Sequence, residues 1–307
     1  MRRLLRLRVI VSAFVLVVVV YGGVSWVFSD KLIAPQFKSL GAVNVGTFGL
    51  PQPVGVKIPG DGVTLAGWYF ANPRKQHCAV IMLHGFGGGR AEVLAPTPIF
   101  WDRGCDLLLY DSRGHGASSP SLLSYGVHER QDLRLAIGWL SGRAKLPDSR
   151  IGLIGWSYGA AVSIQAAALV HNLAFVIADS SYSSLGDMAS VQAENQFGWW
   201  ARVFVPGALL VAGERGGFDA SAAAPAAVIR SVRSPVFLIH SQQDGFTPAD
   251  QSRVIYAHSD HSRTRLLIPP WEATHAHSYT QNPAAYTAAV DAFLARFSPG
   301  FGVRRKR

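Results

Sequence analysis

Residues 151–159 read IGLIGWSYG, an apolar run that leads into a Gly-x-Ser-x-Gly motif. The run at 151–154 is predicted to be a buried strand, and the alanine-rich stretch at 158–170 is predicted to be a helix. A serine between such a strand and helix lies on a tight, strained turn, where flanking glycines keep side chains away from the neighbouring backbone. The N-terminus of the helix favours the negative charge that develops when the serine attacks a carbonyl. This stretch therefore predicts an α/β fold with Ser157 as a nucleophile.

Strand-like and helix-like stretches alternate along most of the chain. Apolar runs predict strands at 54–58, 65–70, 79–83, 106–110, 151–154, 173–178, 236–239 and 265–268. Helices are predicted at 90–103, 128–140, 158–170, 248–258 and 283–297. This alternation is typical of a mostly parallel central sheet of about eight strands flanked by helices, here forming one domain at 54–298. Ligands bind such sheets at the carboxyl ends of the strands.

An insertion at residues 182–232 interrupts the alternation. It contains no clear strand, and its side chains Trp199, Trp200 and Phe204 are unusually large and apolar for surface helices. We expect this insertion to be a small helical lid over the site, and the alternative is an ordinary pair of surface helices.

The N-terminal residues 1–29 are predicted to be a cytoplasmic basic segment and a transmembrane anchor. Residues 9–28 carry no charge, and twenty helical residues are long enough to cross the ~30 Å hydrocarbon layer. A cleaved signal peptide and a buried core helix are the alternatives. The apolar stretch is longer than the ~7–15 residues usual in signal peptides, and no A-x-A-like site follows it. A stalk at 30–53, broken by prolines, is expected to lead into the domain.

The net charge of +10 comes mostly from the two ends of the chain. Eight of the 29 Lys and Arg residues lie there, so the rest of the chain, with 19 Asp and Glu, is close to neutral. These eight are Arg2, Arg3, Arg6 and Arg8, and Arg304, Arg305, Lys306 and Arg307 in a basic tail at 299–307. A nucleic-acid-binding domain would carry its basic residues on a folded face, so we expect no nucleic-acid partner. The four N-terminal arginines predict a single-pass protein with its N-terminus in the cytoplasm and its domain outside, periplasmic or extracellular.

Two further side chains are needed to activate a serine. The base is expected in the loop after the last strand, which offers His275 and His277. The acid is expected after an earlier strand, because the chain order of such sites is Ser, acid, His. Asp244 follows the strand at 236–239, and Asp179 is the rival acid.

Residues 84–89, HGFGGG, follow the third strand. Their position predicts an oxyanion hole made by the backbone N–H groups of Phe86 and Tyr158. A phosphate-binding loop is the alternative, but neither of its usual glycine patterns occurs. Residues 111–116, DSRGHG, are predicted to be a structural turn in which Arg113 pairs with a carboxylate.

The two cysteines, Cys78 and Cys105, each precede one of two strands expected to be parallel neighbours. In an oxidising compartment a disulfide forms if their Cα atoms lie ~4.4–6.8 Å apart. Two separate buried thiols are the alternative.

Together these motifs resemble α/β-hydrolase-fold proteins across residues 54–297. The sequence looks most like the bacterial branch of predicted esterases and peptidase-like hydrolases that carry an N-terminal membrane segment. The matching stretches are DGVTLAGW at 61–68, LHGFGG at 83–88, YDSRGHG at 110–116, the serine motif, the Asp244 loop and ATHAHSY at 273–279. In related sequences the base precedes a Ser-Tyr-type segment, which implies His275 rather than His277.

The resemblance and the residues together imply a serine hydrolase that cleaves a carboxylic ester through an acyl-enzyme on Ser157. Asp244 and His275 would complete the catalytic set, with a small-molecule or lipid-like acyl substrate and no cofactor or metal. Thioester or amide cleavage is the next choice. A non-catalytic binding protein and an acyltransferase with an acceptor other than water are the remaining alternatives.

Overall fold

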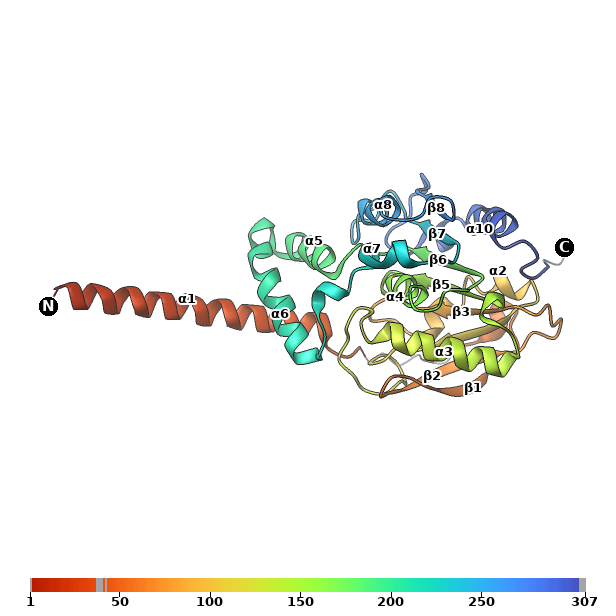
Figure 1. Ribbon diagram of the computed structural model, residues 1–307, viewed down its shortest axis with the longest axis horizontal. Coiled ribbons are helices and arrows are strands. Elements are labelled where there is room, and N and C mark those ends of the chain that lie inside the picture. Colours follow the sequence, from red (N-terminus) through yellow and green to blue (C-terminus); the bar gives the residue numbers. More distant parts are fainter. Residues whose placement is uncertain (1, 37–40, 42, 304–307) are drawn as a thin grey trace.

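An eight-stranded sheet with the order β1-β2-β4-β3-β5-β6-β7-β8 forms the centre of the protein (Figure 1). The computed structural model describes residues 2–36, 41 and 43–303. The strands are β1 Val54–Pro59, β2 Thr64–Phe70, β3 Ala79–Leu83, β4 Asp106–Tyr110, β5 Ile151–Trp156, β6 Phe175–Asp179, β7 Val236–Ile239 and β8 Thr264–Leu267. The pairs β1–β2 and β2–β4 are antiparallel, and the pairs from β4 onward to β8 are parallel. The predicted mostly parallel sheet is confirmed.

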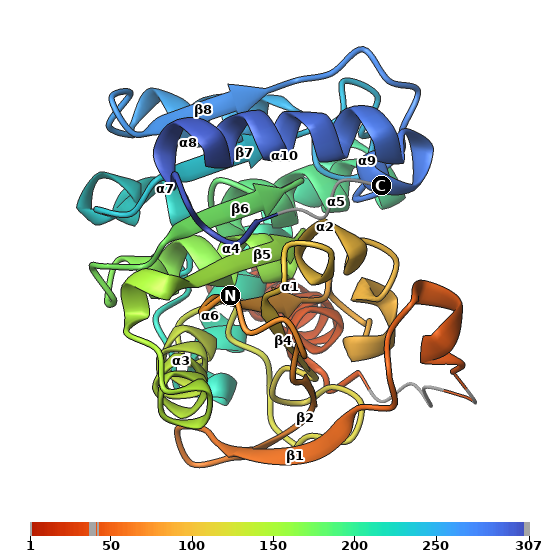
Figure 2. The same ribbon diagram turned by 90° about the vertical axis from the view of Figure 1, so that its right-hand side faces the viewer.

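The central strands are buried on both faces, which explains their continuous apolar sequences. In β3, Ile81 and Leu83 point into one core while Val80 and Met82 point into the other. Figure 2 shows α3 and α4 on one side of the sheet and α2 and α10 on the other. Helices therefore flank both faces, as expected.

Most of the predicted helices occur close to their expected positions. They are α3 Glu129–Ala144, α4 Tyr158–Ala167, α8 Asp250–Ala257 and α10 Pro283–Phe297, with a short α9 Ser278–Gln281 before the last. The helix predicted at 90–103 is wrong. A 3₁₀ turn, Arg90–Val93, and a single-turn helix, α2 Pro98–Trp101, take its place. Pro96 and Pro98 explain the break, because proline has no N–H to donate inside a helix.

The insertion forms a helical layer at one end of the domain, as predicted. Its helices are α5 Leu185–Phe197, α6 Val205–Gly216 and α7 Pro225–Val228, with 3₁₀ turns at Trp199–Phe204, Ala220–Ala222 and Ile229–Ser231. We call the part from α5 to α6 the lid. Figure 1 shows the lid beside the long N-terminal helix, on the side of the domain where this helix enters.

The N-terminal helix α1 covers Arg2–Ile33 and projects from the domain (Figure 1). It is long and apolar enough to cross a membrane, and none of its most apolar window is buried. A buried core helix is therefore ruled out, whereas a membrane anchor and a signal sequence both fit. The helix includes the first four residues of the predicted stalk and ends at Ile33, which is fully buried in the core. In the rest of the predicted stalk, Val45 and Leu50 are buried against the domain, and residues 37–40 and 42 lie outside the described residues.

A disulfide joins Cys78 to Cys105, with their Cα atoms 4.6 Å apart. The parallel register of β3 and β4 pairs Ala79 with Asp106, so the two preceding cysteines lie level with each other. Of the alternatives left open by the sequence, the structure has the disulfide. Phe301, in the predicted C-terminal tail, is buried in the core, and the four basic residues at 304–307 lie outside the described residues.

Candidate active site

Ser157 lies on a strained turn between β5 and α4, as its motif predicts. Its φ of 52° and ψ of −114° fall in a region that residues other than glycine rarely adopt. A Cβ added to Gly155 would lie 2.3 Å from the Gly159 carbonyl oxygen. A Cβ added to Gly159 would lie 2.6 Å from the carbonyl oxygens of Leu83 and His84. Both glycines are therefore required by close backbone packing around the serine.

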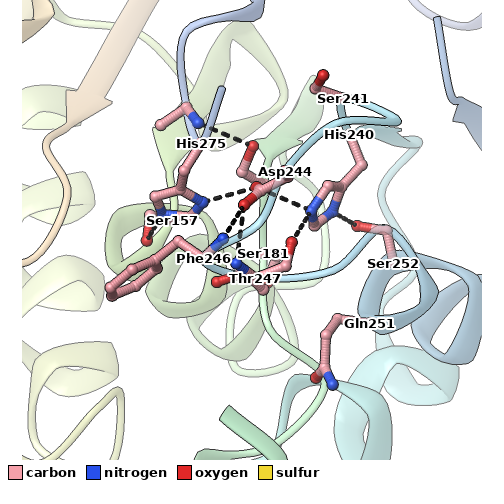
Figure 3. Close-up of polar contacts among 12 residues, drawn as sticks. Ser157, Ser181, His240, Ser241, Asp244, Phe246, Thr247, Gln251, Ser252 and His275 are labelled. Carbon is pink, nitrogen blue, oxygen red and sulfur yellow. Dashed lines mark hydrogen bonds and ion pairs between the residues drawn. The ribbon is translucent and has the colours of Figure 1, made fainter. Parts of the chain in front are cut away.

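A chain of hydrogen bonds connects Ser157, His275 and Asp244 (Figure 3). The Ser157 hydroxyl donates to Nε2 of His275 over 2.7 Å. Nδ1 of His275 donates to Oδ2 of Asp244, also over 2.7 Å. The carboxylate can only accept, so the network assigns the His275 proton to Nδ1 and leaves Nε2 as the acceptor. The structure thus brings together the three side chains that the sequence predicted, from the ends of β5, β7 and β8.

Asp244 is held in its charged form by donors on both of its oxygens. The backbone N–H groups of Phe246 and Thr247 donate to Oδ1 over 3.0 and 2.8 Å. Burial raises the pKa of Asp244, but hydrogen bonds from His240 and His275 outweigh burial and hold this pKa well below its usual range. A negative charge therefore persists beside His275 at neutral pH.

The sequence reasoning missed His240, a fully buried residue that directly follows β7. Its Nε2 lies 3.1 Å from Asp244 Oδ2 and 2.6 Å from the Thr247 carbonyl oxygen, both acceptors, so Nε2 carries the proton. Its Nδ1 accepts from the Ser252 hydroxyl over 2.7 Å. A histidine four residues before the candidate acid was the available signal.

The two rival residues have other partners. His277 is exposed, and its Nδ1 lies 2.7 Å from the His275 carbonyl oxygen. Asp179 is fully buried, burial raises its pKa to about 6, and its Oδ1 accepts from the Ser180 hydroxyl. The Ser180 hydroxyl in turn accepts from the backbone N–H of Ala276, next to His275. Asp179 is thus linked through Ser180 to the backbone of the loop that carries His275, and its carboxylate is not hydrogen-bonded to the His275 ring in the described residues.

The loop after β3 lies directly beside Ser157. A Cβ added to Gly85 would be 3.6 Å from the Ser157 Cβ. In the described part of the chain, the backbone N–H groups of Phe86 and Tyr158 make no hydrogen bond. The N–H of Tyr158 belongs to the first turn of α4, where helical N–H groups lack an intrahelical acceptor. Both groups are available to a ligand oxygen next to Ser157.

Two buried histidines position this loop. His84 accepts the Ser112 N–H at Nε2 over 3.0 Å, and His115 accepts the Gly87 N–H at Nε2 over 3.2 Å. Burial lowers the pKa of His84 to about 3, with a further contribution from the neighbouring His115. Burial also lowers the pKa of His115, so both rings are neutral at neutral pH and accept hydrogen bonds. The predicted structural turn is also present, because Arg113 pairs with Asp132 over 2.6 Å.

A cavity of about 290 Å³ opens beside Ser157. Most of its lining surface is apolar, and the lining comes from the end of α1, the lid and the loops that follow β3, β4, β5, β6 and β7. The lining residues are Phe28, Lys31, Leu32, Phe86, Tyr125, Ser157, Tyr158, Tyr182, Met188, Ala189, Gln192, Ala193, Gln196, Phe197, Val205, Ala208, Phe246 and Thr247. No group of His, Cys, Asp or Glu side chains within the described residues is arranged to hold a metal ion.

Known proteins resemble this chain in sequence and in structure. A sequence profile of the alpha/beta hydrolase fold matches residues 79–222. The uncharacterized protein YqkD of Bacillus subtilis is 27% identical over 260 residues, which are 84% of this chain and 82% of the relative. A polyketide transferase of Penicillium is 32% identical over 121 residues, 38% of this chain and 41% of the relative.

Among solved structures, an esterase of Pyrococcus furiosus matches with a TM-score of 0.70 and 25% identity. The match covers 86% of this chain and 98% of the esterase. These likenesses support hydrolase activity. With its sheet order, its serine turn and the sequence match over residues 79–222, the chain has the α/β-hydrolase fold.

Proposed function

We propose that this protein is a serine hydrolase that cleaves a carboxylic ester through an acyl-enzyme on Ser157. The observation that carries the proposal is the hydrogen-bond chain from Ser157 through His275 to Asp244. A serine hydroxyl is a weak nucleophile until a neighbouring base accepts its proton, and His275 Nε2 is within reach to do so. The likeness to the Pyrococcus furiosus esterase supports an ester as the substrate, with thioester or amide cleavage as the next choice.

In the first half of the reaction, Ser157 Oγ attacks the carbonyl carbon while His275 Nε2 takes the hydroxyl proton. The tetrahedral intermediate collapses, the C–O bond to the leaving group breaks, and His275 gives its proton to the departing alcohol oxygen. In the second half, water attacks the acyl-enzyme and gives a proton to His275, which returns it to Ser157 as the acid leaves. Asp244 stabilises the charged imidazole in both halves.

The oxygen of the tetrahedral intermediate requires hydrogen-bond donors. The backbone N–H groups of Phe86 and Tyr158 are the proposed donors, because neither donates to an acceptor within the described residues and both lie next to Ser157. Each donor of this kind contributes on the order of 3 kcal/mol to the stability of the transition state.

We also propose that α1 is an uncleaved anchor and that the domain lies outside the cytoplasmic membrane. Arginines before the apolar run support this orientation. The Cys78–Cys105 disulfide supports it independently, because disulfides persist in oxidising compartments. Protease added to spheroplasts should cleave the domain, whereas complete protection would reverse the orientation.

The test of the activity uses full-length protein and its Ser157→Ala variant with p-nitrophenyl acetate and butyrate. We expect turnover by the wild type and a loss of more than about 10³-fold in the variant. A fluorophosphonate probe should label only the wild type. Labelling or turnover that survives in Ser157→Ala would show that another residue is the nucleophile.

A second candidate function is acyl transfer to an acceptor other than water. The local similarity to a Penicillium polyketide transferase favours it. Added alcohols or amines would then divert the acyl group from Ser157 without a matching release of free acid. Turnover of any kind would argue against the remaining alternative, a binding protein without catalysis.

A further inference from the structure

The end of α1 is part of the wall of the cavity that contains Ser157. Phe28 and Leu32 of α1 line this cavity together with Met188 and Phe197 of the lid. The backbone fixes this part of α1 to the domain, because the Tyr125 hydroxyl donates to the Leu32 carbonyl oxygen over 3.0 Å. The N-terminal helix is therefore a component of the site as well as an apolar segment.

The same stretch of α1 packs tightly against the lid. The Tyr21 hydroxyl donates to the Val203 carbonyl oxygen over 3.1 Å and accepts from the Gly207 N–H over 3.2 Å. A Cβ added to Gly207 would lie 2.3 Å from Ser25 Oγ, so side chains of α1 pack directly against the backbone of α6 at this glycine.

Towards its C-terminal end, α1 contacts both α5 and α6 of the lid. The rings of Phe28 and Phe197 stack at 5.2 Å. Arg215, at the end of α6, donates to Ser29 Oγ over 3.0 Å and pairs with Asp30 over 2.8 Å. Tyr21 thus lies beside the start of α6 and Asp30 beside its end, so α1 contacts α6 along most of its length.

This packing determines the depth of the lid in a membrane. The uncharged run at 9–28 needs all twenty of its residues to cross the ~30 Å hydrocarbon layer. Its last eight residues, about 12 Å of helix, lie in the part of α1 that contacts the lid. A bilayer that holds α1 therefore also meets the start of α6 and the 3₁₀ turn before it.

The surface of the lid at this level is apolar. Trp199, Trp200, Val203 and Leu210 are 77%, 51%, 61% and 66% exposed, and we call these four residues the lid tip. Tryptophan is enriched where proteins meet the membrane–water interface, and helices of this kind embed by about 5–10 Å. The nearby charges of Arg202 and Glu194 pair over 3.2 Å, which limits the cost of approaching the headgroups.

We propose that the lid tip lies in the outer interface of the bilayer that holds α1, and that the cavity binds the acyl chain of an ester amphiphile from that bilayer. Phe28 and Leu32 are then specificity-determining residues contributed by the anchor. The substrate half of this inference rests on the proposed serine-hydrolase function. Lys31 is the one charged side chain in the cavity lining. It is exposed, with its ammonium 5.2 Å from the Phe197 ring centre, so no buried charge in the lining opposes an acyl chain.

The selectivity for the length of the acyl chain tests whether α1 forms part of the cavity wall. Full-length Phe28→Ala and Val27→Ala are compared with wild type on p-nitrophenyl butyrate and laurate in phosphatidylcholine–phosphatidylglycerol vesicles. Val27 is the matched control, because it is the adjacent exposed α1 residue outside the cavity lining. We expect the laurate-to-butyrate ratio of kcat/KM to fall about tenfold in Phe28→Ala and to stay at the wild-type value in Val27→Ala. An unchanged ratio in Phe28→Ala would overturn the assignment of α1 to the cavity.

Quenching of tryptophan fluorescence tests the depth of the lid without relying on activity. Full-length protein is placed in the same vesicles with brominated phosphatidylcholine. The quenched fraction should fall in Trp199→Phe/Trp200→Phe and rise slightly in Trp139→Phe, because Trp139 packs against Tyr69 within the domain and contributes only unquenched emission. A quenched fraction that stays the same or rises in the double variant would overturn the membrane contact. A wild type without ester turnover would instead refute the proposed function, and quenching would still decide the position of the lid.

Discussion

Nε2 of His240 lies 3.1 Å from Oδ2 of Asp244, the same oxygen that accepts the hydrogen bond from His275. His240 is in turn oriented by the Ser252 hydroxyl, 2.7 Å from its Nδ1 (Figure 3). The acid of the site is therefore fixed from behind by a buried imidazole and from the front by the candidate base. This arrangement makes Asp244 a rigid, charged acceptor.

Replacing Asp244 by Asn should lower kcat by about 10⁴-fold and leave folding almost unchanged. An amide at this position no longer stabilises the imidazolium or selects the productive tautomer of His275. Asp179→Asn should cost less than about tenfold, because Asp179 reaches the histidine loop only through Ser180. Steady-state kinetics on p-nitrophenyl butyrate measures both. The reverse ranking would identify Asp179 as the acid.

Replacing His240 by Phe should reduce the amount of stability that the protein loses as the pH falls. A depressed folded pKa means that Asp244 stabilises the fold above the usual carboxyl pKa of about 4, and that this stability is lost as pH falls towards the folded pKa. Without His240, one of the hydrogen bonds that lower the pKa of Asp244 is lost. The Tm of the variant should lie below that of wild type at pH 6, and the gap should narrow towards pH 3. Thermal unfolding in detergent measures this gap, and a gap that widens in acid would contradict the assignment.

Removing the disulfide by Cys78→Ser/Cys105→Ser should destabilise the domain by about 3–4 kcal/mol. The bond closes a loop with a sequence separation of 27, and the cost follows from the chain entropy that the unfolded state regains. Thermal unfolding with and without reductant measures it, because reductant should lower the Tm of wild type and leave the double variant unchanged. Two thiols titratable in the unfolded, non-reduced wild type would show that the bond is absent.

Most of the fold could be predicted from local sequence because the central strands are buried on both faces. Such strands read as uninterrupted apolar runs, as at Ala79–Leu83. Ser157 could be located because the glycines on either side of it are sterically required. The predicted helix at 90–103 failed where two prolines outweigh the apolar periodicity.

Other features depend on contacts between distant parts of the chain. The choice between His275 and His277 needed a resemblance to related sequences, because two residues of separation in a loop do not determine which ring reaches Ser157. From the sequence, Phe28 was interpreted only as the last residue of an apolar span and Leu32 only as part of the stalk that follows it. Their position in the cavity wall follows from the packing of α1 on a lid some 170 residues later in the chain.

Replacing Gly159 by Ala should destabilise the protein by about 2–3 kcal/mol and reduce activity along with it. A methyl group there would meet two backbone carbonyl oxygens at 2.6 Å, and backbone atoms of a buried strand end cannot move aside as a flexible side chain can. Gly138→Ala is the matched control, because Gly138 lies inside helix α3 with nothing within 4 Å of its added Cβ. That variant should be more stable than wild type by about 0.5–1 kcal/mol, since alanine is the better helix former. Thermal unfolding of the two full-length variants in detergent tests the pair. Equal behaviour of the two would mean that the turn at Ser157 is looser than the close contacts around Gly159 require.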